Sequence, residues 1–543
     1  MTVEFKSDRK QLSDDDLVST AVCMANARGG EIYLGVEDDG TVTGVNSGRT
    51  NAGALSGLIA ARTMPPLSVR AAELEEEGKP VVRLEIPQSD RLVATVSGKL
   101  LRRRLKPDGT PECVPLYPHE IASRESDLGT VDYSALPVRG ATFADFDPLE
   151  RARLRKLIKA QTGDRALLDL SDDELDGALG LVADAGGTRV PTVAGLLLIG
   201  SDAGLHRHLP THEILFQVLD GTEVRVNETY RTPLLRAFER IEELFLARVV
   251  EHEVEVGLFR ISVPNVDRRA FREALANALT HRDYARLGAV QVQWREDELE
   301  IGSPGGFVEG VSLDNLLTIQ PRPRNPRLAD AFKRVGLAER TGRGVDRIFE
   351  GLVRTGLGRP DYGRSDPTRV VVRFPLGDAD FAFVRMITEA ERARGGLLPV
   401  DALLVLGMAR DEGRIDIARA ARAIQRSEDE ARKTVSSLVE AGLLESHGQA
   451  RARTYTLSSK VYLTMGKPAA YVRQAGFDGL QQEQMIMKWV RKHGPIRRSQ
   501  AAELCKLEPR QAGRLLTKMT EEGQLVMTGE RRHAAYHLPA ENR

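Results

Sequence analysis

The sequence has little cysteine and no long hydrophobic run. Its three cysteines, Cys23, Cys113 and Cys505, lie far apart and form no C-x-x-C pair, so their spacing indicates neither a zinc site nor a disulfide framework. No apolar stretch approaches the ~20 residues that span a bilayer, and the N-terminus lacks the apolar core of a signal peptide. These absences favour a cytoplasmic protein without a membrane segment.

The sequence also lacks a P-loop and a substantial net charge. The pairs Gly98-Lys99 and Gly466-Lys467 are not followed by Ser or Thr, so the G-x-x-x-x-G-K-[ST] motif is absent and a P-loop helicase motor is excluded. The net charge is −1, but residues 484–543 carry twelve Lys and Arg against six Asp and Glu, a local +6. With 543 residues, 41% hydrophobic and 29% charged, the chain has the composition of an ordinary protein of roughly three to five domains.

The stretch from Arg268 to Phe307 carries the most informative pattern. Apolar residues recur there with helical spacing and predict an amphipathic helix. Glu273, Asn277 and His281 are four residues apart, so they share one edge of that helix. The Asn277 carbonyl oxygen suits Mg²⁺, and Glu273 could polarise a water beside a metal-bound phosphate. The pattern alone also fits a surface helix with a solvated polar edge.

These residues resemble the GHKL ATPases, the group of gyrase, the mismatch-repair ATPase and the histidine kinases. Glu273, Asn277 and Ala278 match their N-box, and the Gly-rich adenine box resembles residues 303–306. A second Gly box resembles Thr341-Gly342-Arg343-Gly344, where phosphate would meet backbone amides at the start of a helix. One departure concerns the adenine box, which usually begins with Asp and here begins with Ser303, so the nucleotide preference is left open.

Three motifs narrow the resemblance: N-A-L-T-H-R-D-Y, S-P-G-G and P-R-N-P-R-L. Together they are similar to the ATPase of bacterial Schlafen-type regulators, the RecG-like transcriptional regulator group. The resemblance implies ATP and Mg²⁺ as ligands, Glu273 as the catalytic residue and Asn277 as the metal ligand. It implies nucleotide contacts from Asn277, His281, Asp283, Ser303, Gly305, Gly306, Arg324, Asn325, Gly342 and Gly344.

A basic stretch lies between the two Gly boxes. Residues 321–347 carry eight Lys and Arg against three Asp and Glu. In GHKL proteins this segment is the lid over the nucleotide, and the fixed charge and planar fork of arginine suit a triphosphate. A loop that faces DNA is an alternative interpretation of the same residues.

Residues 1–125 resemble the AlbA-type nucleic-acid-binding domain of Schlafen proteins. The E-F-K and A-N-x-x-G-G-x-I-x-x-G-V-x-D motifs are both present. Asp38-Asp39-Gly40 predicts a hairpin between Ile32–Val36 and Thr41–Val45. The sequence K-L-L-R-R-R-L-K, Lys99–Lys106, resembles the basic strand of the family. Alternate residues of a strand face opposite ways, so only part of its arginines can line one groove, and a solvated basic face is the alternative. The resemblance implies nucleic-acid contacts from Lys6, Arg102, Arg103 and Arg104.

Some Schlafen proteins are RNA nucleases that use clustered carboxylates in this domain. Glu4 and Asp38 or Asp39 match part of such a cluster. The Glu that precedes E-F-K in those proteins has no counterpart, and two carboxylates would hold a metal loosely. We therefore expect no nuclease activity from this domain.

Residues 126–189 are predicted to form a helical connector, with helices over Pro148–Thr162 and after Ser171. Residues 190–376 are predicted to form one α/β unit that begins with strands, the first at Val193–Gly200. A long helix is expected from Pro233 to Glu251 and a last strand over Arg369–Pro375. Three histidines of this unit have no acidic partner nearby and are interpreted as solvated loop residues: His206, His208 and His212.

The remaining sequence indicates two winged helix domains, at residues 380–462 and 480–540. In the first, Ser427 caps a helix whose first turn is acidic, which favours protein docking over DNA. In the second, a helix over Arg510–Glu522 carries a basic face, which favours DNA. The predicted nucleic-acid contacts there are Lys506, Arg510, Arg514 and Lys518.

The sequence thus predicts an α+β multidomain protein with an AlbA-like α/β domain, a GHKL α/β sandwich of the Bergerat type, and C-terminal winged helix-turn-helix domains. The preferred function is an ATP-binding and DNA-binding regulator, a homodimer or higher homo-oligomer, whose partner is duplex DNA. The alternative is an enzyme, an ATPase or nuclease of phage defence that acts on foreign nucleic acid. A steady-state ATPase assay with and without duplex DNA separates the two classes.

Overall fold

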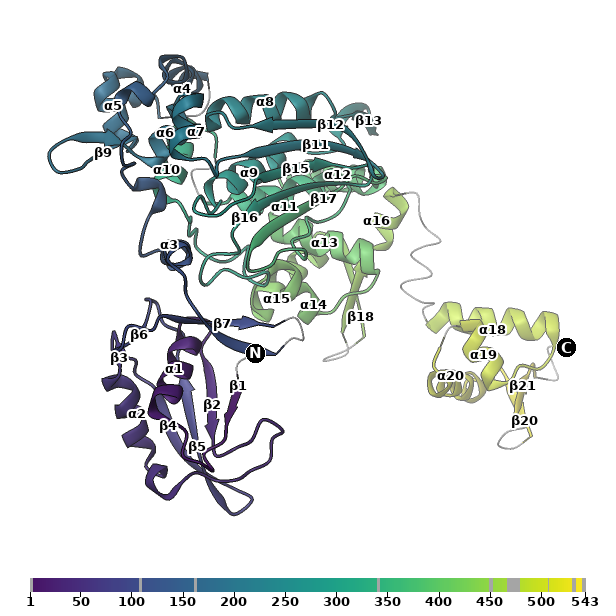
Figure 1. Ribbon diagram of the computed structural model, residues 1–543. Helices are drawn as coiled ribbons and strands as arrows, with labels where there is room; N and C mark the ends of the chain where they lie inside the picture. The colour runs from purple at the N-terminus through teal and green to yellow at the C-terminus, as the bar shows by residue number, and fades with distance from the viewer. Residues whose placement is uncertain are drawn as a thin grey trace.

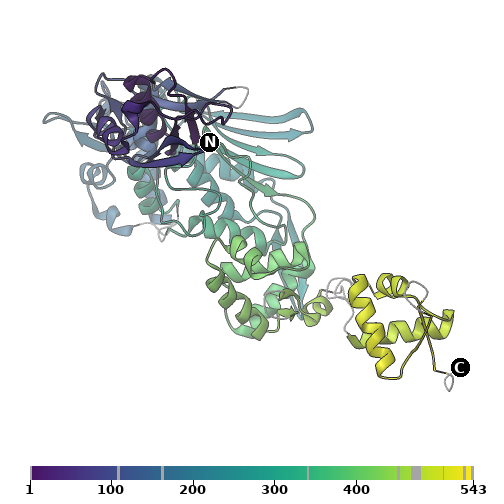
Figure 2. The same cartoon turned by 90° about the horizontal axis from the view of Figure 1, so that it is seen from below.

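The computed structural model describes residues 3–106, 110–160, 164–338, 342–448, 453–465, 479–505, 507–529 and 534–539. The chain is a multidomain α+β protein in which strands and helices mix up to residue 375 and helices dominate afterwards. Figures 1 and 2 show an N-terminal domain, a large α/β domain with a helical unit against it, and a C-terminal unit. None of the helices in the described part of the chain has the length and apolarity needed to cross a bilayer.

The N-terminal domain is built on a four-stranded sheet with the order β1-β2-β5-β4. The first pair is parallel and the other two pairs are antiparallel. The helices α1 (Asp14–Ala25) and α2 (Ala52–Ala61) supply apolar side chains to the core beneath the sheet. The strands are β1 (Val3–Lys6), β2 (Gly30–Leu34), β4 (Arg70–Glu76) and β5 (Lys79–Ile86), and short pairs follow in β3 (Thr63–Met64) with β6 (Ala94–Thr95) and β7 (Leu101–Leu105) with β8 (Pro111–Pro115).

Two expectations for this domain need correction. A disulfide joins Cys23 of α1 to Cys113 of β8, although the sequence spacing indicated none. The pair is 90 residues apart in the chain, and only the packing of α1 against the β7–β8 hairpin brings the two together. The predicted hairpin at residues 32–45 has its turn, with Glu37 N–H bonded to Thr41 O at 2.9 Å. Beyond it there is only the isolated bridge between Val36 and Val42, and no returning strand.

The helix α3 (Pro118–Asp127) leads from the N-terminal domain into a helical region in which α4 begins at Pro148 as predicted. Ser171 caps α5 as predicted, by accepting a hydrogen bond from the Glu174 N–H. The helices are α4 (Pro148–Ala160), α5 (Asp172–Ala178), α6 (Val193–Ile199) and α7 (Asp202–His208), and β9 (Val182–Asp184) pairs with β10 (Arg189–Pro191).

The strand predicted at residues 193–200 is wrong, because that segment is the helix α6. All seven residues of α6 are buried, so the apolar run shows no period that could separate a helix from a strand. The histidine prediction is wrong for His212, which is buried and has Nε2 2.8 Å from Thr232 O. Its pKa is lowered to about 4 by burial, which keeps the imidazole neutral. His206 and His208 lie in α7 instead of a loop, and His208 has an acidic partner after all, since its Nε2 lies 3.5 Å from Asp145.

The large α/β domain contains a five-stranded sheet with the order β12-β11-β15-β16-β17. The β11–β15 pair is parallel and the other pairs are antiparallel. Figure 1 shows the helices on one face of this sheet, where Phe216, Val292, Ile301 and Phe374 meet Phe271 in one core. The strands are β11 (Ile214–Asp220), β12 (Glu223–Tyr230), β15 (Val290–Trp294), β16 (Glu298–Pro304) and β17 (Arg369–Pro375), and the helices are α8 (Leu234–Leu246), α9 (Arg268–Thr280), α10 (Pro326–Val335) and α11 (Gly344–Arg354).

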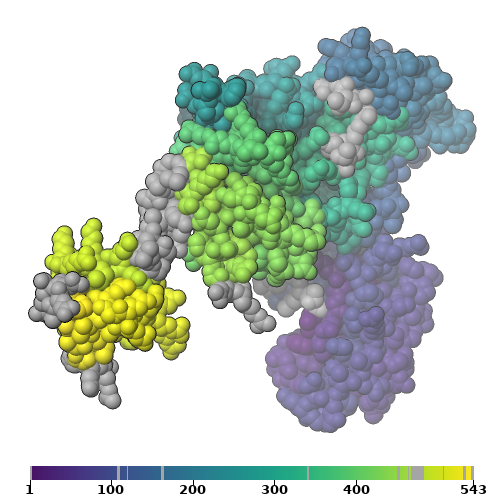
Figure 3. Space-filling model, turned by 180° about the vertical axis from the view of Figure 1, so that it is seen from behind, coloured from purple at the N-terminus to yellow at the C-terminus, as the bar shows by residue number. Residues whose placement is uncertain are grey.

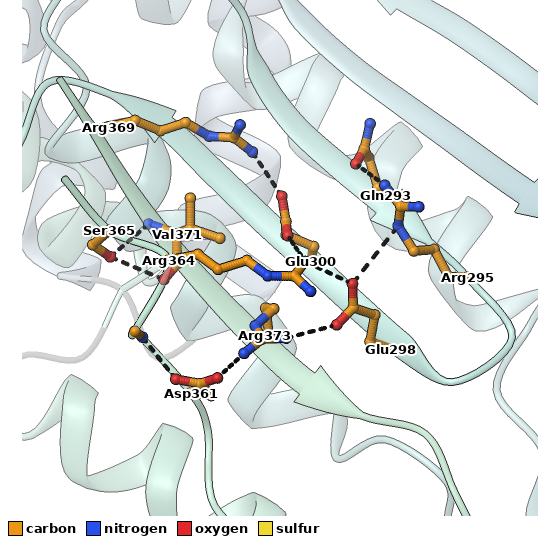
Figure 4. Close-up of polar contacts among 11 residues, drawn as sticks. Gln293, Arg295, Glu298, Glu300, Asp361, Arg364, Ser365, Arg369, Val371 and Arg373 are labelled. Atoms are coloured by element: carbon orange, nitrogen blue, oxygen red, sulfur yellow. Dashed lines mark hydrogen bonds and ion pairs between the residues drawn. The ribbon is translucent and has the colours of Figure 1, made fainter. Parts of the chain in front are cut away.

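The opposite face of the sheet is polar. Glu300 of β16 pairs with Arg369 at 2.7 Å and with Arg364 at 3.0 Å, and Glu298 pairs with Arg373 at 3.1 Å (Figure 4). The Arg369 side chain lies across Gly302, where a Cβ atom would be 2.6 Å from Nη2. The carboxylates of this face are paired with arginines of the same face, so it is stable without a covering layer of helices.

The chain after residue 375 forms two units with the same order, helices followed by a two-stranded hairpin. The first packs against the α/β domain through α11 and α13, and Figure 3 shows it (green) lying against that domain. The second has a hydrophobic core of its own. The first contains α12 (Phe381–Arg394), α13 (Val400–Glu412), α14 (Ile417–Ile424), α15 (Glu428–Glu440), β18 (Leu444–His447), β19 (Thr454–Leu457) and α16 (Ser459–Thr464), and the second contains α18 (Gly479–His493), α19 (Arg498–Cys505), α20 (Pro509–Glu521), β20 (Val526–Thr528) and β21 (Ala535–His537).

Candidate functional site

A cavity of about 310 Å³ lies beside α9 in the α/β domain. Its walls are α9, the end of β16, the N-terminus of α11 and the segment Phe307–Pro323. The predicted residues that line it are Glu273, Asn277, His281, Ser303, Gly305, Gly306, Gly342 and Gly344. The fold thus brings the α9 motif and both Gly boxes to one site.

Glu273 lies in the wall of this cavity with only 7% of its surface exposed. Burial raises its pKa to about 7, against the opposing effect of Arg347, Lys333 and Arg272. A Cβ atom on Gly344 would be 1.9 Å from Glu273 Oε1, so only glycine lets α11 begin this close to the carboxyl group. The site therefore holds a carboxyl group that is partly protonated at neutral pH, directly beside a helix N-terminus.

Asn277 and His281 continue this edge of α9 into the cavity. Asn277 is half-buried, one turn from Glu273, with its carboxamide on the cavity wall. His281 caps the helix, and its N–H donates to Asn277 O at 2.9 Å. Burial, with Arg324 and Lys333, lowers the pKa of His281 to about 4, so its imidazole is neutral at physiological pH. The edge offers a ligand an amide oxygen and a neutral ring.

The first Gly box is shaped by the surrounding protein. Ser303 Oγ donates to Ala278 O at 2.7 Å, which ties β16 to α9. Gly305 has φ +96°, and a Cβ there would be 2.9 Å from Asp283 Cβ. A Cβ on Gly306 would be 2.7 Å from Pro367 O. Both glycines are therefore required by backbone packing alone, whatever ligand the cavity accepts.

Asp283, Arg324 and Asn325 do not line the cavity, although the resemblance implied ligand contacts for them. Arg324 is buried and donates to His281 O at 3.0 Å and to Gly306 O at 2.7 Å, and it forms an ion pair with Asp127. Asn325 is also buried and donates from Nδ2 to the backbone oxygens of Thr280, at 2.9 Å, and Arg282, at 2.8 Å. Asp283 pairs with Arg286 at 2.9 Å. In this structure the three side chains pack behind the residues that line the cavity.

The second Gly box adds positive charge to the cavity. Gly342 has φ +76°, and a Cβ there would be 2.7 Å from Pro321 Cγ. Thr341, the first residue of the box, lies outside the described residues. Arg322, Lys333 and Arg343 line the cavity together with the start of α11, where Arg343 pairs with Asp346 at 3.2 Å. A helix N-terminus surrounded by cationic side chains favours an anionic ligand.

Two lining residues were not singled out from the sequence. Lys333 was counted only as part of the basic stretch, and its place in the last turn of α10 points it to the cavity. Tyr362 carries no sequence signal, because it lies in a segment of turns before β17. It lines the cavity, and burial together with the Glu273 charge raises its pKa.

The cations predicted in the N-terminal domain are paired with carboxylates. Arg103 and Lys6 both pair with Glu4, at 2.6 Å and 2.9 Å. On the other side of the β7 strand, Arg102 pairs with Glu120 at 2.5 Å and Arg104 pairs with Glu112 at 2.6 Å. The expected alternation along the strand is confirmed, and every one of the four cations would have to exchange a carboxylate for a phosphate.

The carboxylates considered for nuclease chemistry serve other contacts. Glu4 accepts the two ion pairs just described, and Asp39 accepts a hydrogen bond from the Thr41 N–H at 2.9 Å. Within the ranges that the structure describes, no group of three or more His, Cys, Asp or Glu side chains is arranged to hold a metal ion.

The helix α20 presents its predicted basic face to solvent. Arg510, Arg514 and Lys518 are all exposed, and Lys518 Nζ lies 2.8 Å from Glu483. Lys506 lies outside the described residues. In the first helical unit, Ser427 caps α15 as predicted and the three acidic residues that follow it are exposed. The first turn of α15 is therefore acidic at the surface, whereas the exposed face of α20 is basic.

The fold and the site define a multidomain α+β protein with a cavity in its central α/β domain. Residues 1–106 match the family model described as Schlafen, AlbA_2, and residues 288–374 match the model described as putative ATP-dependent DNA helicase recG C-terminal. The second match contains both Gly boxes but not α9. Residues 121–215 match a domain of unknown function. The protein thus combines an AlbA-type N-terminal domain with a domain similar to the RecG C-terminal, HATPase-type family.

No curated protein matches the chain. Among solved structures, the crystal structure of the DIP2311 protein from Corynebacterium diphtheriae is similar over 99% of this chain and 95% of that chain. The two share 23% sequence identity, with a TM-score of 0.52. This similarity shows that the two chains share a fold.

Proposed function

We propose that the protein is an ATP-binding and DNA-binding regulator whose nucleotide site is the cavity beside α9. The observation that carries the proposal is the meeting of Glu273, Asn277 and the 342–344 box at one cavity. The match of residues 288–374 to a family described as ATP-dependent supports it. The GHKL resemblance of the same motifs predicts a Bergerat-type arrangement for this domain.

The lining residues fit a magnesium nucleotide. Arg322, Lys333, Arg343 and the amide groups at the start of α11 would hold the phosphates. The Asn277 carbonyl oxygen is a ligand of the kind that Mg²⁺ prefers. The metal would neutralise charge on the phosphates. The remaining wall, at Ile301 and in β17, is apolar and suits the flat face of a base.

Glu273 is the group that would make the site hydrolytic. A general base works best when its pKa lies near the operating pH, and burial raises the pKa of Glu273 to about 7. Glu273 then accepts a proton from the attacking water in that fraction of molecules in which it is ionised. We infer a slow ATPase, in keeping with a regulatory role rather than a motor.

We propose that both C-terminal units are winged helices, since each has helices followed by a two-stranded hairpin. In the second unit α20 would be the recognition helix, with Arg510, Arg514 and Lys518 at phosphates or bases. In the first unit, the acidic start of α15 would repel DNA and favours a protein contact. The N-terminal domain would add phosphate contacts, chiefly through Arg104, whose side chain is 55% exposed. A homodimer on duplex DNA is the assembly that we propose.

The proposed ATP site is tested by calorimetry of ATP with Mg²⁺ on the full chain. Asn277→Ala should abolish Mg²⁺-dependent binding, because it removes an oxygen ligand from a metal that few protein groups hold. Asn227→Ala is the matched control, since Asn227 is exposed on β12 and only accepts a hydrogen bond from Gln217 at 3.0 Å. Equal ATP affinity in the native protein and both variants would contradict the proposal.

A further inference from the structure

The segment Phe307–Pro323 connects the cavity with two other parts of the molecule. It leaves β16 at the first Gly box and contains turns but no helix or strand. Val311, Leu316, Leu317 and Ile319 line the cavity from this segment. A stretch of chain without its own hydrogen-bonded ladder moves more easily than the strands and helices around it.

The middle of the segment is held by Gln425 of the first helical unit. The Gln425 side chain accepts a hydrogen bond from Leu317 N–H at 2.8 Å and donates one to Leu313 O at 2.8 Å. Gln425 is the C-cap of α14, with φ 56°, in the turn between α14 and α15. A single side chain thus binds the backbone of the cavity wall at two points from the helix-turn-helix of the neighbouring unit.

Leu317 makes the connection apolar as well. Its side chain is 9% exposed, lines the cavity, and belongs to the hydrophobic core of the first helical unit. Tyr362, on the same cavity, stacks on Phe349 of that core with ring centroids 6.3 Å apart. Because protein cores are close-packed, a ligand that displaces either side chain disturbs the packing behind it.

The start of the segment is held by the N-terminal part of the chain. Glu309 accepts a hydrogen bond from Gln88 of the N-terminal domain at 2.5 Å and one from Arg124 of α3 at 3.0 Å. Its own N–H donates to Asp127 O at 3.1 Å. The cavity wall is therefore bonded to the N-terminal domain at Glu309 and to the helical unit at Gln425.

We propose that the segment Phe307–Pro323 transmits occupancy of the cavity to the α14–α15 turn, and that Gln425 is the positioning residue that holds the two together. This inference rests on the proposed nucleotide site. The volume of about 310 Å³ is at the lower end for small-molecule sites and the segment forms part of the wall, so a bound nucleoside triphosphate would lie against the segment. The α14–α15 turn then follows the segment, or the two Gln425 hydrogen bonds break.

Hydrogen–deuterium exchange with and without Mg²⁺-ATP tests this on the full chain. In the native protein, ATP should slow exchange at residues 301–323 and 342–348, and also at residues 417–440. Gln425→Asn shortens the side chain by one methylene and keeps a residue type that tolerates positive φ. It should retain the protection at the cavity and lose it at 417–440, while amides at 313–319 exchange at least about fivefold faster without ATP.

Two further variants make the result specific. Gln425→Glu keeps the side-chain length and can still accept from Leu317 N–H, but it cannot donate to Leu313 O. It should therefore weaken the ATP-dependent protection at 417–440, and it serves as the test if Gln425→Asn proves unstable. Arg422→Ala is the matched control, since Arg422 is exposed on the same helix, and it should behave as the native protein.

Absence of protection at every site would overturn the proposed nucleotide site itself. Protection confined to the cavity in the native protein, or unchanged at 417–440 in both Gln425 variants, would overturn the coupling alone.

Discussion

The contact between Gly344 and Glu273 gives the most specific prediction. Gly344 does not have a positive φ, so alanine is allowed by its backbone, and the added Cβ would meet Glu273 Oε1 at 1.9 Å and Cδ at 2.7 Å. Overpacking of this kind costs about 1–3 kcal/mol, whereas replacing glycine in a helix gains up to about 1 kcal/mol. Gly344→Ala should therefore destabilise the α/β domain by roughly 1–2 kcal/mol.

A double-mutant cycle separates this contact from other effects of the substitution. In a Glu273→Ala background the obstacle is gone, so Gly344→Ala should become neutral or stabilise by up to about 1 kcal/mol. Trp294 lies in the α/β domain and Trp489 in the C-terminal unit, so Trp489→Phe leaves a fluorescence signal that reports urea unfolding of the α/β domain. Equal destabilisation in both backgrounds would refute the reasoning, because the carboxyl group would then not be what the Cβ meets.

Three other predictions follow from charges. The triple change Arg510→Ala, Arg514→Ala, Lys518→Ala should reduce the slope of log K against log salt for DNA by up to about 2–3 units, measured by fluorescence anisotropy; an unaltered slope would assign α20 to protein docking. Since burial raises the pKa of Glu273 to about 7, its base form increases as pH rises through 7, so ATP turnover should increase over the same range, and Glu273→Gln should lose ~10²–10⁴-fold in rate together with this pH step. Glu4→Gln should release Lys6 and Arg103 from their ion pairs with Glu4. Nucleic-acid affinity should then rise, more at low salt than at high salt, and an unchanged affinity would show that Lys6 and Arg103 do not contact nucleic acid.

Elements with a clear period or a cap could be predicted from the sequence. The helix α9 begins and ends where its apolar spacing indicates, and Ser171 and Ser427 cap the helices that follow them. The helix predicted over Arg510–Glu522 agrees within one residue with α20, and the helix predicted after Ser427 agrees with α15. In each case the signal is local, since spacing and capping involve residues within one or two turns of one another.

The errors concern interactions between distant parts of the chain. The apolar segment at 193–199 is buried on all sides, and neither a helix nor a strand period survives such burial. The Cys23–Cys113 bond depends on a packing contact across 90 residues. The same reason explains Arg324, for which the resemblance implied a nucleotide contact. Tertiary structure places it behind the cavity, with backbone oxygens as acceptors.

The candidate site could be predicted in outline. The residue spacing placed Glu273 and Asn277 on one edge, and glycines at 305 and 344 stand where a Cβ would collide with protein atoms. Lys333 and Tyr362 complete the cavity from α10 and from the turns before β17, at positions where no local pattern distinguishes a lining side chain from any other.

The most direct test of the nucleotide site is photo-crosslinking with 8-azido-ATP and Mg²⁺, followed by peptide mapping. The base would lie against the apolar wall, so label is expected in the peptides that contain residues 301–323 or 370–372, and excess ATP should prevent it. Asn277→Ala should reduce the labelling at the same nucleotide concentration, and Asn227→Ala should not. Label elsewhere in the chain, or label that ATP does not displace, would contradict the assignment of this cavity to ATP.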